Sequence, residues 1–390
     1  MNLWHLGLCL IAASAVAGAG QVEWKHLSSK TGDLPAPGNS TQQTASLILD
    51  VDKDGVNDFV IAARQKAPSL VWFRRTKTGW TRYVIDKDLL PLEAGGTCAD
   101  IDGDGDLDIV MADDYSGNRV YWWENPCPDF DPNVPWTRRL IKDSGGKKHH
   151  DQLFGDFDGD GKPELVFWNQ GAKTLFLAKI PPDPKAPQPW QLTPIYTYQT
   201  GEHEGLAACD LDGDGKIELT GAGRYFKHEG GTKFSTHVID ASQHFTRVAA
   251  GRLLAKSEWA QVLFAPGESR GRLLWYEWDG GKQWLPHDPL GHDVVNCHSL
   301  ALADTNGDGH LDIFCGEMHT PGHGADATLW AFYGDGKGGF APQVISKGIC
   351  SHESKVADLD GDGRLDILAK PYTWDTPRID VWLNQGIRNR

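Results

Sequence analysis

The chain has 390 residues, among them 45 glycines and 16 tryptophans, and its formal net charge is −15. No long stretch shows the periodicity of a helix, so the composition favours an all-β protein. The acidic balance, without any basic stripe, argues against a nucleic-acid partner.

Residues 3–18 form an apolar run that ends in small residues. This is typical of a secretory signal peptide, although no lysine or arginine precedes the run. The run is too short and too rich in alanine and glycine for a membrane span. We therefore expect residues 1–19 to be removed, and the mature protein to be secreted or periplasmic without a transmembrane segment.

Residues 22–28 (VEWKHLS) read as a strand that has no repeat of its own. They match the last strand of later repeats, whereas the C-terminal repeat stops after three strands. The simplest account is that the N-terminal strand completes the last sheet. Such closure would remove the exposed edges that invite aggregation.

Residues 358–366 (DLDGDGRLD) place carboxylates at positions 1, 3, 5 and 9 and glycine at position 6. This spacing lets the oxygens of one short loop surround a hard cation such as Ca²⁺, and the glycine permits the sharp turn. The loop differs from an EF-hand loop in its length and in the strand-like run that follows.

Copies of this loop begin at residues 50, 100, 156, 210, 304 and 358, at intervals of 50 to 56 residues with one double-length gap. Six divalent ions would contribute about +12 and offset most of the negative charge. We therefore expect about six structural Ca²⁺ sites. Their expected ligands are Asp50, Asp52, Asp54 and Asp58; Asp100, Asp102, Asp104 and Asp108; Asp156, Asp158, Asp160 and Glu164; Asp210, Asp212, Asp214 and Glu218; Asp304, Asn306, Asp308 and Asp312; and Asp358, Asp360, Asp362 and Asp366.

The double-length gap hides a seventh repeat, because residues 244–251 parallel residues 203–210 although the following loop has lost its acids. Each repeat of about 53 residues suffices for a four-stranded sheet that must stack on its neighbours. We predict one domain over residues 20–390, a seven-bladed β-propeller. In six blades a calcium loop would join the first two strands.

Histidines recur shortly before these loops. His150, Glu204, His298 and His352 stand six residues before the first loop ligand, and His149, His203 and His244 stand seven before it or its equivalent. Because the loops cap one end of each hairpin, these residues should converge at the opposite mouth of the channel. The ends of the second strands add further polar side chains there. The candidate catalytic residues are His150, His203, Glu204, His298, His352, Arg224, Tyr225, His319 and Lys370.

Imidazoles that lie close together bind a transition metal such as Zn²⁺ or serve acid–base chemistry. Such a mouth suits proton abstraction next to a carbonyl or uronate, with a histidine or Tyr225 as base. Arg224, Lys370 or a metal would bear the developing charge. Trp168, Tyr115 and Tyr372 are candidates to stack on sugar rings, and Glu353 to orient a histidine ring.

These loops and strands resemble the FG-GAP/VCBS-repeat β-propellers, whose blades are of the integrin-α type. The resemblance covers the chain after the signal, and it implies a fold rather than a function. Residues 150–155, 203–208 and 297–308 also resemble the propeller of secreted aldos-2-ulose dehydratases. That likeness implies a metal-containing site for sugar dehydration or elimination, although we expect no additional domain after the propeller.

Two classes of function follow. The first is a carbohydrate-active lyase, of the sugar dehydratase or polysaccharide lyase type, with a sugar or polysaccharide as ligand. The alternative is a non-catalytic module for carbohydrate or protein binding or adhesion. A cluster of titratable histidines discriminates between them, because adhesion needs none. The sequence leaves the substrate, the oligomeric state and the disulfide pairing open, with Cys297 and Cys350 as one candidate pair.

Overall fold

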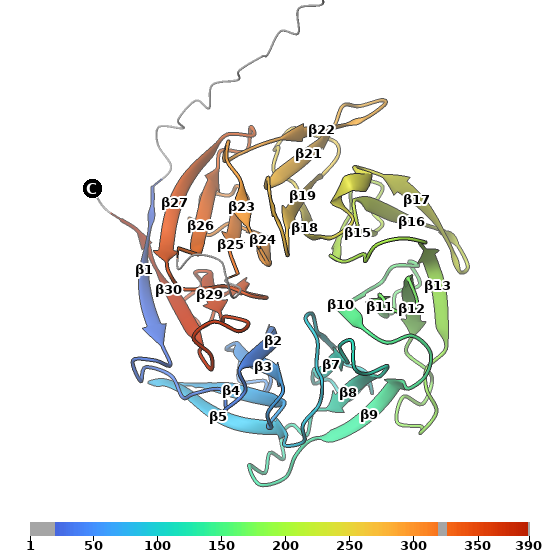
Figure 1. Ribbon diagram of the computed structural model, residues 1–390, viewed down its shortest axis with the longest axis vertical. Helices are drawn as coiled ribbons and strands as arrows, with labels where there is room; N and C mark the ends of the chain where they lie inside the picture. The colour runs from blue at the N-terminus through green and yellow to red at the C-terminus, as the bar shows by residue number, and fades with distance from the viewer. Residues whose placement is uncertain (1–19, 319–325, 389–390) are drawn as a thin grey trace, which may run out of the picture.

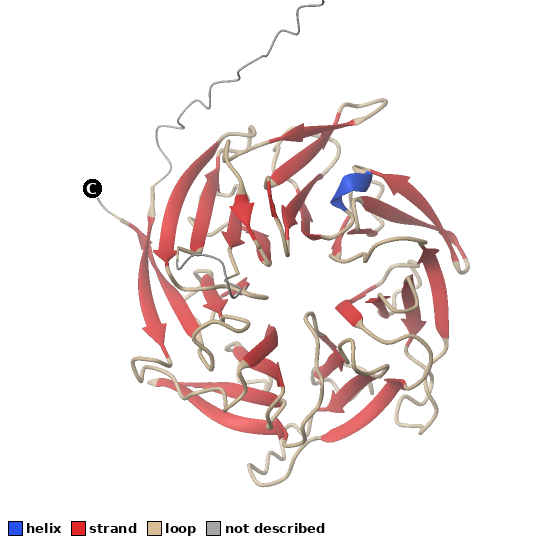
Figure 2. Cartoon of the chain, viewed as in Figure 1, coloured by secondary structure: helices blue, strands red, loops and turns tan. Residues whose placement is uncertain are grey.

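The computed structural model describes residues 20–318 and 326–388. In this part of the chain, almost all regular structure is β-strand, and one 3-10 turn, η1 (Ala241–Gln243), is the exception (Figure 2). No helix in the described ranges is long and apolar enough to cross a membrane. The expected signal peptide lies outside the described residues.

Seven four-stranded antiparallel sheets are arranged as blades around a central channel (Figure 1). The predicted seven-bladed β-propeller is thereby confirmed. Blade 1 contains β2 (Gln42–Leu49), β3 (Asp58–Arg64), β4 (Leu70–Thr76) and β5 (Gly79–Asp86); blade 2 contains β6 (Thr97–Ala99), β7 (Asp108–Ala112), β8 (Val120–Glu124) and β9 (Thr137–Lys142); blade 3 contains β10 (His149–Gly155), β11 (Glu164–Asn169), β12 (Thr174–Lys179) and β13 (Leu192–Thr197).

The remaining blades follow in chain order. Blade 4 contains β14 (Ala207–Cys209), β15 (Glu218–Gly221), β16 (Arg224–Gly230) and β17 (Lys233–Val238); blade 5 contains β18 (Thr246–Gly251), β19 (Gln261–Pro266), β21 (Leu274–Trp278) and β22 (Trp284–His287); blade 6 contains β24 (Ser299–Ala303), β25 (Asp312–Gly316), β26 (Thr328–Gly334) and β27 (Phe340–Lys347); blade 7 contains β28 (Lys355–Ala357), β29 (Asp366–Ala369), β30 (Asp380–Ile387) and β1 (Val22–Ser28). A small two-stranded sheet joins β20 (Arg270–Gly271) to β23 (Val294–Val295).

The apolar core of the molecule lies between the blades. Seven buried clusters each combine residues of two neighbouring blades, so that every blade packs on both sides. For example, Trp72 of blade 1 lies in one cluster with Trp123 of blade 2. A short sheet cannot bury both of its faces alone, and radial stacking satisfies this requirement for every blade at once.

The ring closes between the two ends of the described chain. Strand β1 pairs antiparallel with β30 and becomes the outermost strand of blade 7. The N-terminal strand therefore covers the edge that the C-terminal strand would otherwise expose.

The first two strands of each blade form a hairpin, and this hairpin positions the site. In blade 3, Gly155 pairs with Glu164 beside the acidic loop, and His150 pairs with Trp168 at the other end. The acidic loops and the strand starts therefore lie at opposite ends of the innermost strands. Blade 5 has the same hairpin, β18 and β19, without the acids.

One cysteine pairing differs from the candidate pair. Cys297 is bonded to Cys315, and not to Cys350. Cys315 belongs to β25. This strand pairs with β24, which begins two residues after Cys297. The partner thus lies on the neighbouring strand of the same blade, with the two Cα atoms 6.5 Å apart.

Candidate functional site

The six acidic loops have the geometry that their spacing predicts. Glycine at position 6 has a left-handed backbone in each, with φ between 84° and 89°. In at least four loops, single oxygens of three carboxylates lie within 4.8 Å of one another. The buried Oδ1 atoms of Asp52 and Asp360 have no hydrogen-bond partner in the described structure. This donor set fits a hard cation such as Ca²⁺, and the six-site assignment stays a prediction.

The ninth residue of the loops has a second role. Asp108 accepts a hydrogen bond from the backbone of Ile101 at 3.0 Å and another from Asn125 at 2.8 Å. Asp366 does the same with Leu359 and Asn384, at 2.8 and 2.7 Å. These aspartates therefore tie the loop to the end of the third strand.

At the opposite end of the hairpins, three residues from three blades meet. Single donor atoms of His150, Glu204 and His298 lie within 4.8 Å of one another, and all three residues are buried. His150 Nε2 lies 3.5 Å from Glu204 Oε2. Glu204 Oε1 and His298 Nδ1 have no hydrogen-bond partner in the described structure. Two imidazoles and one carboxylate form a donor set that fits a divalent transition metal such as Zn²⁺.

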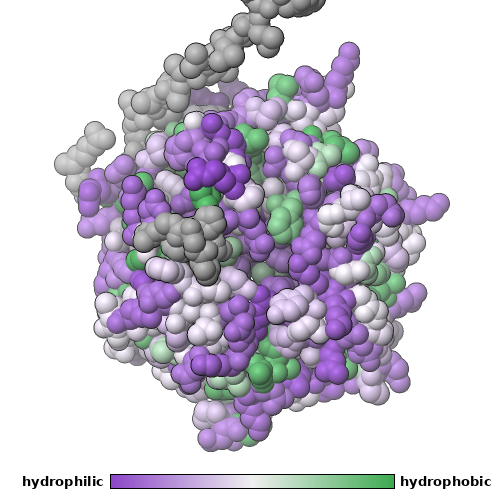
Figure 3. Space-filling model, in the orientation of Figure 1, coloured by the Kyte–Doolittle hydropathy of each residue, from purple (hydrophilic) through white to green (hydrophobic). Residues whose placement is uncertain are grey.

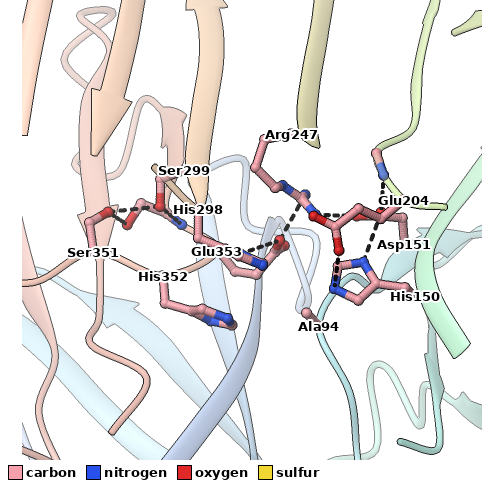
Figure 4. A network of polar contacts seen from close by, with 12 residues as sticks. Ala94, His150, Asp151, Glu204, Arg247, His298, Ser299, Ser351, His352 and Glu353 are labelled. Atoms are coloured by element: carbon pink, nitrogen blue, oxygen red, sulfur yellow. Dashed lines mark hydrogen bonds and ion pairs between the residues drawn. The ribbon is translucent and has the colours of Figure 1, made fainter. Parts of the chain in front are cut away.

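A second layer of charged groups surrounds this triad (Figure 4). Asp151 Oδ2 lies 2.9 Å from His150 Nδ1, and Glu353 Oε1 lies 3.7 Å from His298 Nδ1. Arg247 bridges the two carboxylates, at 2.7 Å from each. Gly267 leaves room behind the triad, since a Cβ there would lie 2.8 Å from Glu204 Oε1.

His352 completes the histidine cluster. Its ring stacks on His298 at 4.3 Å and on Tyr372 at 4.9 Å between centroids. Lys370 is fully buried behind it, with Nζ 3.1 Å from His352 Nδ1 and 2.9 Å from the carbonyl oxygens of His352 and Gln43. Lys370 therefore supports His352 and does not face a substrate, contrary to the prediction that it bears charge at the mouth.

These residues open into a cavity of about 130 Å³ at the channel mouth. Its lining combines the histidines with aromatic and charged side chains. The lining residues are Arg64, Glu93, Ala94, Tyr115, Lys148, His150, Gln170, Glu204, Phe245, Glu268, His298, His352 and Tyr372. Both cavity-lining basic residues are already paired, Arg64 with Glu93 and Asp114 and Lys148 with Glu202. The face of the ring seen in Figure 3 is mostly hydrophilic, as a polar ligand requires.

Burial and neighbouring charges separate the protonation states of the cluster. Burial lowers the pKa of His298 to about 3, and burial with Lys370 nearby holds that of His352 well below its usual range. Burial alone would lower the pKa of His150, but Asp151 and Glu204 raise it to about 10. Burial raises the pKa of Glu204 to about 7. Without a metal, the cluster thus combines one cationic and two neutral imidazoles.

The structure turns two of the predicted histidines away from this cluster. The His203 ring stacks on Tyr198 at 3.7 Å and contacts Trp168. His149 Nδ1 lies 2.9 Å from the carbonyl oxygen of Asp113. Both precede a residue that points into the mouth. His149 and His150 begin β10, where neighbouring side chains face opposite sides, and His203 directly precedes Glu204 in the segment before β14.

Other predicted site residues also lie elsewhere. Arg224 donates to the carbonyl of Ala222 and covers Tyr196, and Tyr225 stacks on His237 at 4.6 Å, away from the cavity. Trp168 is fully buried and is not available to a sugar, whereas Tyr115 and Tyr372 line the cavity as predicted. His319 lies outside the described residues.

Sequence reasoning missed Asp151 and Arg247. One signal was available for Asp151. Five residues before the first loop ligand, blades 2 and 4 carry Gly95 and Gly205 with positive φ, and blades 3 and 7 carry Asp151 and Glu353, also with positive φ. An acidic residue at a position that otherwise favours glycine indicates a functional site, because backbone strain is retained mainly where function requires it. Arg247 carried no such signal.

Comparisons with known proteins agree with this fold. The model of the FG-GAP-like repeat matches residues 100–167, 156–220 and 258–315. The chain is thus a seven-bladed β-propeller that carries FG-GAP-like repeats. Among solved structures, it is similar to BBS1N, determined in complex with ARL6DN, with a TM-score of 0.55 at 12% identity over 94% of this chain and 98% of the other. This likeness concerns the fold alone.

One relative of known activity is a carbohydrate lyase. The chain is 24% identical over 311 residues to the rhamnogalacturonan exolyase YesX of Bacillus subtilis (strain 168), which covers 69% of this chain and 47% of the relative. The chain therefore spans about half the length of this relative. The crystal structure of YesX also matches, with a TM-score of 0.48 at 13% identity over 95% of this chain and 75% of the other. The protein is thus a propeller with distant similarity to a carbohydrate lyase.

Proposed function

We propose that this protein is an exported, calcium-stabilised carbohydrate lyase that works at the channel mouth opposite the acidic loops. The observation that carries the proposal is the convergence of His150, Glu204 and His298 from three blades in one cavity. The similarity to a rhamnogalacturonan exolyase supports a substrate that contains sugar acids. The cavity volume of about 130 Å³ suits a single sugar ring at the end of a chain.

Charge balance supports a metal at the triad. Arg64 and Lys148, which line the cavity, are paired with carboxylates, so neither is free to hold the carboxylate of a uronate. His150, Glu204 and His298 would hold a divalent ion such as Zn²⁺. When bound, this ion would bind the uronate carboxylate and stabilise the negative charge that develops on it.

His352 is the proposed base. Its lowered pKa leaves the ring uncharged at neutral pH, as a base requires. Lys370 contacts Nδ1, which leaves Nε2 for the substrate. Burial lowers the pKa of Lys370, which favours the neutral amine. A neutral amine would accept a hydrogen bond from Nδ1–H of His352 and so keep the lone pair of the ring on Nε2.

The reaction follows from these placements. His352 Nε2 takes the proton from the carbon next to the carboxylate, and the electron pair of that C–H bond forms a carbon–carbon double bond. The bond to the glycosidic oxygen on the next carbon breaks, and this oxygen takes a proton from water; the hydroxide that remains is neutralised by the proton on His352. Tyr115, an exposed ring 5.8 Å from the Arg64 guanidinium, provides a ring face for the sugar, and Tyr372 lines the cavity between Arg64 and His352.

The test is the release of an unsaturated product from rhamnogalacturonan and polygalacturonate, followed by the ultraviolet absorbance of the new double bond. The double variant with His298→Ala and His352→Ala should lower kcat/KM by about 10³-fold, because it removes a metal ligand and the base. His237→Ala, at an exposed ring on blade 4, is the matched control and should retain activity.

Full activity of the double variant would place the chemistry elsewhere. If the wild-type protein binds these polymers but releases no unsaturated product, the non-catalytic binding module is the better description. Binding that depends on His298 and His352 would then still assign the ligand to the mouth.

A further inference from the structure

Arg247 occupies the centre of the polar network in Figure 4, although it touches none of the three proposed metal ligands through a hydrogen bond or ion pair in the described structure. It belongs to β18 of blade 5, the blade whose loop has lost its acids. Its Nη1 lies 2.7 Å from Asp151 Oδ1 in blade 3, and its Nη2 lies 2.7 Å from Glu353 Oε1 next to blade 7. One guanidinium therefore joins three blades across the channel.

Each of these carboxylates also orients the triad. The second oxygen of Asp151 lies 2.9 Å from His150 Nδ1 and accepts a hydrogen bond from the backbone of Gly205 at 2.7 Å. Gly205 directly follows Glu204, so Asp151 fixes two of the three ligands. Glu353 Oε1 lies 3.7 Å from His298 Nδ1 and so contacts the third ligand, His298.

The backbone is strained where it presents these carboxylates. Asp151 and Glu353 have φ of 46° and 53°, and the equivalent positions of blades 2 and 4 are Gly95 and Gly205. A left-handed backbone at a residue other than glycine costs free energy that the surroundings must compensate. Here the ion pairs with Arg247 supply that compensation, and they aim both carboxylates toward the centre of the channel.

We propose that Arg247 is the positioning residue of the mouth, and that its double ion pair pre-organises His150, Glu204 and His298 for one divalent metal. This inference depends on the proposed function only in taking these three residues as metal ligands. An arginine is required because its planar fork can hold two carboxylates at once, which the single ammonium of lysine cannot do in the same geometry. Partners that orient metal ligands typically change metal affinity by about 10- to 100-fold when they are replaced.

The experiment compares Arg247→Lys and Arg247→Met in the full chain, with calcium present throughout and Zn²⁺ alone as the probe. Equilibrium dialysis measures zinc affinity, and mouth binding is defined as the zinc lost in His298→Ala. The matched control is Arg378→Lys, because Arg378 also pairs with two carboxylates, those of Asp375 and Asp380, and is equally buried (side chain 14% exposed, against 12% for Arg247). Nitrogen chemical shifts of the histidine rings, measured without zinc, report the orientation of His150 and His298.

We expect Arg247→Lys to weaken zinc binding at the mouth by about 10- to 100-fold and to shift both histidine ring signals, with a melting temperature like that of Arg378→Lys. Arg378→Lys should leave zinc affinity unchanged. If Arg247→Met unfolds, Arg247→Lys alone decides the question. Wild-type zinc affinity in a folded Arg247→Lys protein overturns the inference.

Failure of the proposed function gives a different result. If the wild-type protein binds no zinc at the mouth, the metal part of the proposed function fails. Arg247 is then judged by the ring signals alone. Unchanged signals of His150 and His298 in Arg247→Lys would overturn its positioning role, and shifted signals would support it.

Discussion

Where the chain enters the innermost strands of blades 3 and 4, the first of two neighbouring residues packs away from the mouth and the second points into it. His150 and Glu204 point inward, whereas His149 and His203, each one residue earlier, pack away from the cavity. The sequence spacing predicted the inward pair together with His298 and His352. It could not predict that Arg247 would meet acids of two other blades.

The pH dependence of stability should depend on His149, which is fully buried. Its Nδ1 lies 2.9 Å from the carbonyl of Asp113, and its Nε2 lies 3.3 Å from the amide nitrogen of Asn169. Burial, together with the Lys142 charge, lowers its pKa to about 3. As the pH falls below about 6.5, the unfolded chain takes up a proton that the folded protein excludes. The stabilisation is therefore complete above that pH, and about 2 kcal/mol of it is lost by pH 5.

The measurement is the free energy of urea unfolding at pH 7.5 and pH 5, with calcium present. His149→Gln cannot titrate, so the drop between the two pH values should be about 2 kcal/mol smaller than in the wild-type protein. His237→Gln, at an exposed ring, should show the wild-type drop. An equal drop in His149→Gln and the wild type would contradict the prediction.

Each acidic loop is an element with two tasks. Its first carboxylates gather toward a common point, and its ninth residue accepts hydrogen bonds from the backbone. In the four loops that end in aspartate, this residue ties the loop to the third strand. In the two loops that end in glutamate, a lysine of the third strand approaches the same carboxylates: Lys179 lies 2.7 Å from Asp160, and Lys227 lies 2.8 Å from Asp214. Both loops therefore attract positive charge, as expected for cation sites.

Chelation should lower the melting temperature by at least about 5 °C, because loop carboxylates without cations repel one another and each filled site adds stability. The measurement is thermal unfolding in excess EDTA and after calcium is restored. The variant with Asp102→Asn and Asp104→Asn should show a smaller response. Asp131→Asn, in an exposed turn outside the loops, should respond like the wild type. An unchanged melting temperature in EDTA would argue against the six calcium sites.

The whole molecule is stabilised by closure. Seven clusters between blades form a continuous ring of contacts, and the pairing of β1 with β30 lets blade 7 contain four strands like the others. The same closure places strand starts from all blades around one mouth. Residues as distant in sequence as Asp151 and Glu353 can therefore share one guanidinium.

Removal of residues 20–28 should open the ring. Strand β30 would then present a row of unpaired backbone groups, and the apolar contacts of β1 would be lost. We expect this shortened chain to aggregate or form higher oligomers in size-exclusion chromatography. A chain that starts at residue 20 is the control. A monodisperse shortened chain with the melting temperature of the control would contradict the role of β1 in closure.

The sequence by itself determined the number of blades, the order of their strands and the acidic loops, because these depend on local spacing that recurs in each repeat. It also placed four of the mouth residues, since a register counted from the loop is a local property. Only the tertiary structure decided that His203, Arg224 and Tyr225 turn elsewhere, that Lys370 lies behind His352, and that Arg247 links Asp151 to Glu353. The reason is physical: these contacts join different blades, and the spacing within one repeat carries no information about the side chains that another blade brings across the channel.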